Sequence, residues 1–193
     1  MPEHKTHRLN PRDPFVIDTR ELGRRPGSMR RIQRTVPAPA DLGVELIGVP
    51  VGAPLELDLR LEAVVEGVLI SGTVSGQVAG ECVRCLSPVG DEVEFDLQEL
   101  FAYPDSATDE TTSQDEAGRI EGDLIDLEPT VRDTVVLGLP LSPLCRDDCQ
   151  GLCATCGVHW EDLPAGHGHE RADPRWAALL ERFGEHRPDS QEN

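Results

Sequence analysis

The strongest pattern in the chain is an alternation of apolar and charged residues between positions 55 and 62. Leucine occupies every second position, and Glu56, Asp58, Arg60 and Glu62 fill the positions between. A period of two predicts a strand with one face buried and the other in water. Residues 64–74, 77–82 and 92–97 extend this β pattern, so we expect an antiparallel β meander or a small barrel.

A different period appears between residues 126 and 139. Apolar side chains recur there every four positions: Leu127, Val131, Val135 and Leu139. This spacing, with Pro129 in the first turn, predicts an amphipathic helix. A brief helix is also expected at 19–24, after the capping pattern of Asp18 and Glu21.

Near the C-terminus, residues 174–183 predict a further helix, which places Trp176, Leu179, Leu180 and Phe183 on one face. The expected fold class is therefore α+β. It combines an antiparallel β meander or small barrel with a few helices and a cysteine-rich zinc-knuckle region.

All six cysteines fall in two short stretches: Cys82 and Cys85 in the first, and Cys145, Cys149, Cys153 and Cys156 in the second. Two C-x-x-C pairs are present, at 82–85 and 153–156. Two intervening residues let a tight turn aim both sulfurs at one ion, and four thiolates are a common ligand set for structural zinc. The pattern predicts a structural zinc site with six cysteines as candidate ligands.

The spacing leaves open which four cysteines bind. One set joins the two C-x-x-C pairs (Cys82, Cys85, Cys153, Cys156), a second is local (Cys145, Cys149, Cys153, Cys156), and a third joins Cys82 and Cys85 to Cys145 and Cys149. His159, His167 and His169 follow the second stretch. With six thiols available, we expect cysteine rather than histidine ligands.

Other uses of the cysteines fit less well. The first 14 residues are polar and lack the apolar segment of a secretory signal, which disfavours disulfides. A thioredoxin-like pair needs a βαβ unit, which the pattern does not predict. No run of apolar residues is long enough to span a membrane, and we expect a cytoplasmic protein.

The formal net charge of −18 is unevenly distributed. Residues 1–34 contain nine basic and four acidic residues, so the rest of the chain carries the negative charge. A basic segment can contact phosphate locally while an acidic body repels it. Arg24, Arg25, Arg30 and Arg31, in an expected basic loop at 24–34, are the candidate RNA-binding residues; the alternative is that they pair with the acidic body.

These features divide the chain into three parts. Residues 1–40 are expected to form a basic N-terminal arm, and residues 41–183 a zinc-stapled α+β domain. Residues 105–123 contain seven acidic residues and one arginine, so we expect a disordered acidic insert within that domain. Residues 184–193 are expected to be a disordered tail.

Several sequence blocks resemble one known family: LGRRPGSM, ECVRCL, DLEPTVRDTVVLGLPLSPLC and CQGLCATCG. They are similar to the YceD family of large ribosomal RNA accumulation proteins, in its actinobacterial form. The resemblance implies a role in 23S ribosomal RNA accumulation and large-subunit assembly, and it does not imply an enzyme. It also argues against a site built only from Cys145–Cys156, because relatives outside this form keep the pair that matches Cys82 and Cys85 more faithfully than the later block.

Two functional hypotheses follow. The first is a non-enzymatic, zinc-stabilised factor for large ribosomal subunit biogenesis that contacts precursor ribosomal RNA, a ribosomal protein, or both. The second is a redox-responsive zinc-binding regulatory protein in which two spare thiols promote oxidation. No nucleophile–base pair or phosphate-binding loop is present in the sequence, so neither catalytic residues nor a small-molecule substrate is expected.

Overall fold

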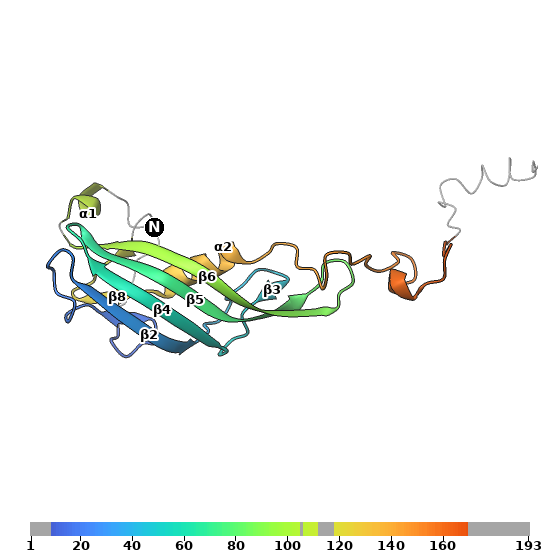
Figure 1. Ribbon diagram of the computed structural model, residues 1–193, viewed down its shortest axis with the longest axis horizontal. Helices are drawn as coiled ribbons and strands as arrows, with labels where there is room; N and C mark the ends of the chain where they lie inside the picture. The colour runs from blue at the N-terminus through green and yellow to red at the C-terminus, as the bar shows by residue number, and fades with distance from the viewer. Residues whose placement is uncertain (1–8, 105, 112–117, 170–193) are drawn as a thin grey trace, which may run out of the picture. The chain divides into compact units, whose positions relative to one another are not determined.

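Antiparallel β-structure dominates the computed structural model, which describes residues 9–104, 106–111 and 118–169 (Figure 1). Contacts divide the chain into two units, one up to Cys149 and one from Gln150. The first unit contains the sheets and is described first.

The main sheet has six strands in the order β2-β4-β5-β6-β7, and β3 pairs with β5 outside this path. Their bounds are β2 Met29–Pro37, β3 Ile47–Gly48, β4 Pro54–Ala63, β5 Gly67–Glu81, β6 Pro88–Ala102 and β7 Gly118–Arg119. All neighbours are antiparallel except β6 and β7. A second, two-stranded sheet joins β1 (Val16–Asp18) to β8 (Leu124–Asp126).

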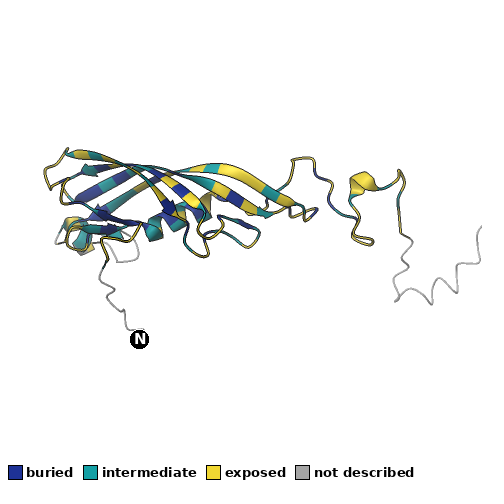
Figure 2. Cartoon of the chain, turned by 90° about the horizontal axis from the view of Figure 1, so that it is seen from below, coloured by how far each residue is buried: buried dark blue, intermediate teal, exposed yellow. Residues whose placement is uncertain are grey.

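The predicted meander is confirmed by β4, β5 and β6, which are consecutive and side by side. The alternating leucines of β4 are all buried, and buried and exposed positions alternate along the strands (Figure 2). The segments expected at 64–74 and 77–82 form one long strand, β5. The sheet path has two open ends, β2 and β7, so the described strands form no closed barrel.

The helix expected at 126–139 is confirmed as α2, Glu128–Gly138. A carboxylate oxygen of Asp126 accepts a hydrogen bond from the backbone N–H of Glu128 at 3.0 Å. All four residues of the apolar stripe are at most 4% exposed. The helix lies along the sheet, with Gly138 against the ring of Phe95, and completes the core (Figure 1).

The N-terminal expectations at 19–24 and 24–34 were wrong in their local structure. Residues 19–24 form turns instead of a helix, because a segment this short gains too few hydrogen bonds to offset helix nucleation. From Met29 onward the expected loop is strand β2, paired along its whole length with β4. Arg34 donates from Nη1 to the carbonyls of Pro14 and Val16 at 2.8 and 3.1 Å, so this strand also holds the segment before it.

The remaining parts of the division are only partly described. Within the expected acidic insert, the structure describes α1 (Ala107–Thr111) and β7, while residues 105 and 112–117 lie outside the described residues. The helix expected at 174–183 and the tail at 184–193 also lie outside them. The division into arm, zinc-stapled domain and tail stays a prediction. No helix of the described part is long and apolar enough to cross a membrane.

Replacing Leu59 by alanine is expected to lower the free energy of unfolding by about 2–5 kcal/mol, because the side chain is 1% exposed and its removal leaves a cavity. Leu137→Ala is the matched control: this leucine of α2 is 84% exposed, and its loss should change stability by no more than about 0.5 kcal/mol. Urea unfolding of both variants measures the difference. Equal effects would contradict the burial pattern.

Candidate metal centres

The first cysteine pair lies in the turn between β5 and β6. The N–H of Cys82 donates to the carbonyl of Ser87, and the N–H of Leu86 donates to the carbonyl of Cys82, both at 2.9 Å. Leu86 adopts a φ of 60°, a left-handed conformation that non-glycine residues rarely take. The two paired strands therefore end in a tight knuckle that turns both sulfurs to one side.

The segment after α2 reaches this knuckle (Figure 1). The N–H of Val83 donates to the carbonyl of Pro143 at 3.0 Å. The guanidinium of Arg84 donates to the carbonyl of Cys149 at 2.7 Å and to that of Asp147 at 3.5 Å. These bonds place a short loop containing Cys145 and Cys149 over the knuckle.

Four sulfurs meet at this point: those of Cys82, Cys85, Cys145 and Cys149, here called the S4 group. Their Sγ atoms all lie within 4.8 Å of one another. The Cys82–Cys149 distance is 3.8 Å and the Cys85–Cys145 distance is 3.5 Å. Tetrahedral Zn–S bonds of about 2.3 Å imply sulfurs about 3.8 Å apart, so the group has the size of a four-thiolate metal site. None of the four is disulfide-bonded, and all but Cys145 are buried.

The surroundings of the S4 group favour thiolates at the knuckle. Burial raises the pKa of Cys82. Hydrogen bonds from the backbone N–H groups of Cys145, Arg84 and Cys85 together outweigh this effect and lower the pKa to about 6. The hydroxyl and N–H of Ser87 lower the pKa of Cys85. The neighbouring Cys85 and then Cys149 raise the pKa of Cys145 to about 12. The negative charge of the neighbouring thiolates thus opposes ionisation of Cys145. A bound cation would offset this repulsion between the four sulfurs.

The second unit contains another group of potential ligands: Cys153, Cys156, His167 and His169, here called the S2N2 group. One ligand atom from each residue lies within 4.8 Å of the others. The Sγ of Cys156 is 3.6 Å from Nε2 of His167. The N–H groups of Cys156 and Thr155 lower the pKa of Cys153 to about 6.

Of the three cysteine sets that the sequence left open, the structure groups the third, Cys82 and Cys85 with Cys145 and Cys149. It groups Cys153 and Cys156 with two histidines, which the sequence analysis had set aside in favour of thiols. The available signal was the spacing of His167 and His169, eleven and thirteen positions after Cys156. His159 is in neither group and instead forms a β-bridge with Leu152. Metal binding by any of these residues stays a prediction.

Both groups fall inside a region that matches a known protein family. The sequence model described as the large ribosomal RNA subunit accumulation protein YceD matches residues 70–181, more than half of the chain. The chain belongs to the YceD family. The match begins within β5 and includes β6, α2 and every cysteine.

Relatives of this YceD-family chain are found among mycobacteria. An uncharacterized protein of Mycobacterium bovis is 56% identical over 171 residues, which are 89% of this chain and 82% of that protein. One of Mycobacterium leprae is 47% identical over 179 residues, 93% of this chain and 82% of that protein. The uncharacterized Bacillus subtilis protein YlbN is 29% identical over 99 residues, which are 51% of this chain and 56% of YlbN. No solved structure is detectably similar to the chain.

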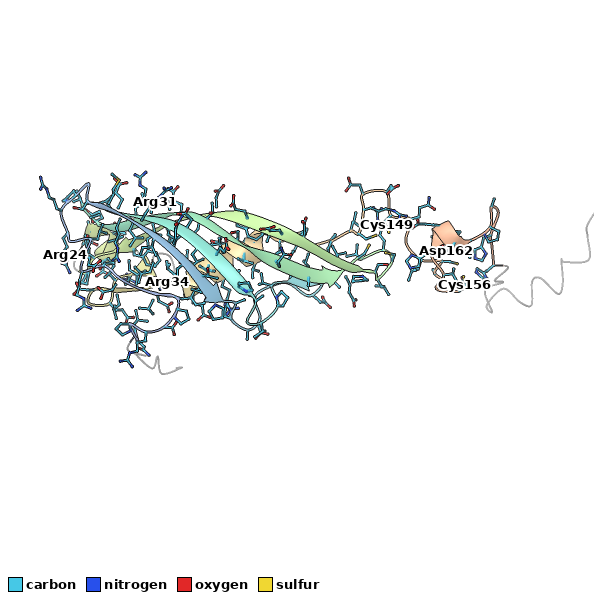
Figure 3. The ribbon with its side chains drawn as sticks, turned by 60° about the horizontal axis from the view of Figure 1, so that its bottom comes forward. Arg24, Arg31, Arg34, Cys149, Cys156 and Asp162 are labelled. Carbon is cyan, nitrogen blue, oxygen red and sulfur yellow. The ribbon has the colours of Figure 1, made fainter. Side chains whose placement is uncertain are left out.

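The arginines expected to contact RNA precede the YceD match and differ in their surroundings (Figure 3). Arg24 lies over the ring of Tyr103, 4.9 Å from its centre. Arg30 pairs with Glu21 at 3.1 Å and donates to a backbone carbonyl. Arg25 and Arg31 are exposed, and their side chains form no hydrogen bond or ion pair with the described residues. The structure thus separates two arginines with intramolecular partners from two that face solvent.

Replacing Arg84 by alanine is expected to loosen the loop that contains Cys145 and Cys149, because its bonds to two loop carbonyls are lost. A net loss of about 1 kcal/mol would speed amide exchange in residues 144–150 roughly fivefold, without comparable change in β4. Hydrogen exchange with mass spectrometry measures this effect. Arg60→Ala removes an exposed arginine of β4 and serves as the control. Equal amide exchange rates of residues 144–150 in the two variants would contradict a stabilising role for Arg84 in this loop.

Proposed function

We propose that this protein is a non-enzymatic factor that supports accumulation of 23S ribosomal RNA and biogenesis of the large ribosomal subunit. The observation that carries the proposal is the match of residues 70–181 to the family described as the large ribosomal RNA subunit accumulation protein. The proposed partners are precursor large-subunit ribosomal RNA and a ribosomal protein, in the cytoplasm. No small-molecule substrate or membrane is part of this proposal.

Zinc is the metal that best fits the S4 group. Four cysteine sulfurs at tetrahedral spacing, with backbone N–H groups supporting the thiolates, match the donors and size of a structural zinc site. All four positions are taken by protein ligands, so such an ion would have no open coordination site for substrate. The fit therefore supports a structural rather than a catalytic role.

The proposed zinc would act as a crosslink between distant parts of the chain. Cys82 and Cys149 are 67 positions apart, and Cys85 and Cys145 are 60 apart. Joining them closes a long loop, which lowers the entropy of the unfolded chain. The crosslink would fix the β5–β6 turn to the segment that follows α2.

Arg25 and Arg31 are the proposed contacts to ribosomal RNA. Both are exposed, and in β2 Arg31 stands opposite Arg60 of β4. Farther along the same sheet face, Asp58 and Asp96 flank Thr73. Exposed arginines without an ion-pair partner among the described residues support local phosphate contact, and the acidic positions of the sheet would suit a basic ribosomal protein.

The redox-responsive alternative has less support once the grouping of the cysteines is considered. It drew support from two spare thiols beside a four-cysteine site, which would promote oxidation. Cys153 and Cys156 instead share a group with histidines, and the S4 group uses the other four cysteines. In a redox role, oxidation would therefore have to occur at cysteines that belong to one of the two groups.

In cells lacking this protein, we expect less 23S ribosomal RNA relative to small-subunit RNA, restored by the wild-type gene. A variant with Arg25→Gln and Arg31→Gln should restore it less well and bind large-subunit precursors more weakly. Because two phosphate contacts are lost, the slope of log affinity against log salt should flatten by about 1–2. Sucrose gradients at several salt concentrations measure the association.

Arg60→Gln is the matched control, since it removes one positive charge from the same face but from an arginine that is ion-paired with Glu62. It should change the slope less than either Arg25→Gln or Arg31→Gln alone. A wild-type protein that stays at the top of the gradient at every salt concentration, in cells with normal 23S levels, would refute the proposed function.

Cys82→Ser is expected to remove one zinc equivalent, because the S4 group loses a buried thiolate. With free zinc at a hundred times its dissociation constant, the lost binding lowers the free energy of unfolding by about 2.7 kcal/mol. Metal analysis of the purified protein and urea unfolding measure the two effects. Val83→Ala, in the same turn, should retain the zinc; an unchanged metal content in Cys82→Ser would contradict zinc binding by the S4 group.

A further inference from the structure

We infer that residues 151–169 form a second, separate zinc site whose ligands are Cys153, Cys156, His167 and His169. The chain would then hold two structural zinc ions of different donor class, four sulfurs in one site and two sulfurs with two imidazole nitrogens in the other. This inference does not depend on the role in ribosomal RNA accumulation.

The first argument is the backbone of the two knuckles. The N–H of Cys153 donates to the carbonyl of Val158, and that of Gly157 donates to the carbonyl of Cys153, both at 2.8 Å. These bonds repeat, at the same spacing, those that Cys82 makes with Ser87 and Leu86. Gly157, at a φ of 72°, takes the left-handed position that Leu86 occupies in the first knuckle. Cys153 and Cys156 therefore lie on the same kind of turn as Cys82 and Cys85, both of which belong to the S4 group.

The second argument is the geometry of the histidines. Zn–S and Zn–N bonds of about 2.3 and 2.0–2.1 Å at a tetrahedral angle place sulfur and nitrogen about 3.6 Å apart. The Sγ of Cys156 lies 3.6 Å from Nε2 of His167. The ring centres of His167 and His169 are 4.5 Å apart and the rings are nearly perpendicular; His167 and Trp160 form a second T-shaped pair, 5.7 Å between ring centres. The two imidazoles thus lie beside the sulfurs, and ring contacts hold their orientation.

The third argument is the lack of a core in this segment. Among residues 150–169, the only buried side chain is that of Cys153. Yet the segment is folded, with a bridge between Leu152 and His159, the short helix η1 (Trp160–Asp162) and a turn from Pro164 to His167. A segment this short cannot be stabilised by so little buried apolar surface, and small domains of this kind usually depend on a metal.

The two sites should differ in how readily they release metal. Three of the four S4 ligands are buried, whereas Cys153 is the only buried ligand of the S2N2 group. Water and chelators reach exposed ligands more easily. The S2N2 zinc should therefore be extracted first when a chelator is added to the intact protein.

The test is the zinc content of the full-length protein and of a variant with His167→Ala and His169→Ala. We expect the variant to hold one zinc equivalent fewer than the wild type, while the far-ultraviolet β signal of the main sheet is unchanged. His159→Ala is the matched control, because this histidine lies in the same segment but outside the group, and it should keep the wild-type content. Equal zinc in the wild type and the double variant would overturn the inference.

X-ray absorption at the zinc edge supplies a second readout on the folded wild-type protein. Two zinc ions bound as inferred give an average first shell of three sulfurs to one nitrogen. In a variant with Cys82→Ser and Cys85→Ser, the remaining zinc should show equal sulfur and nitrogen. A wild-type shell made only of sulfur would exclude histidine ligands and overturn the inference.

Discussion

The crowding of four thiols at the β5–β6 turn is the constraint on which the first unit depends. Backbone N–H groups hold Cys82 as a thiolate, and each further ionisation is opposed by the charge already present, until Cys145 has a pKa of about 12. Beyond Val78 the hairpin has almost no buried side chains, and its end is largely exposed (Figure 2). The hydrophobic core therefore cannot fix this end of the hairpin. Its cohesion rests on the backbone ladder with β6 and β3, on hydrogen bonds to the loop after α2, and on whatever neutralises the sulfurs.

The opposite end of the sheet is organised by arginine instead of sulfur. Arg30 and Arg34 alternate with solvent-facing residues along β2 and bond the backbone of residues 14–18. Because carbonyls accept these bonds, the arginines are satisfied without being buried in apolar surroundings. Only the outward-facing arginines are left for a partner. The same short basic segment thus serves both the fold and the proposed contact to RNA.

The sequence predicted those elements whose pattern is local and misjudged those that depend on distant neighbours. The leucines of β4 and the four-residue stripe of α2 have periods that report burial directly, and both were confirmed. In β2 the inward positions include Arg30 and Arg34, so the alternation reads as polar and predicts a loop where the structure has a strand. The sequence found the cysteines of the S4 group, but choosing among three sets required knowing that the segment after α2 returns to the β5–β6 turn. Six thiols favour cysteine ligands by number alone, and the approach of His167 and His169 to Cys156 appears in the folded chain.

The two knuckles show how the same turn is supported in two different contexts. Leu86 holds a left-handed φ that costs a non-glycine residue about 1–2 kcal/mol. The fully paired strands β5 and β6 enter and leave this turn, and their ladder imposes the conformation. Within the described part of the second unit, the knuckle has no such ladder and a single bridge, between Leu152 and His159. Gly157 removes the backbone cost at the equivalent position, since glycine adopts positive φ freely. A segment with one bridge and almost no core can form this turn because glycine removes the backbone cost, and the proposed ion would add the free energy of binding to its four ligand atoms.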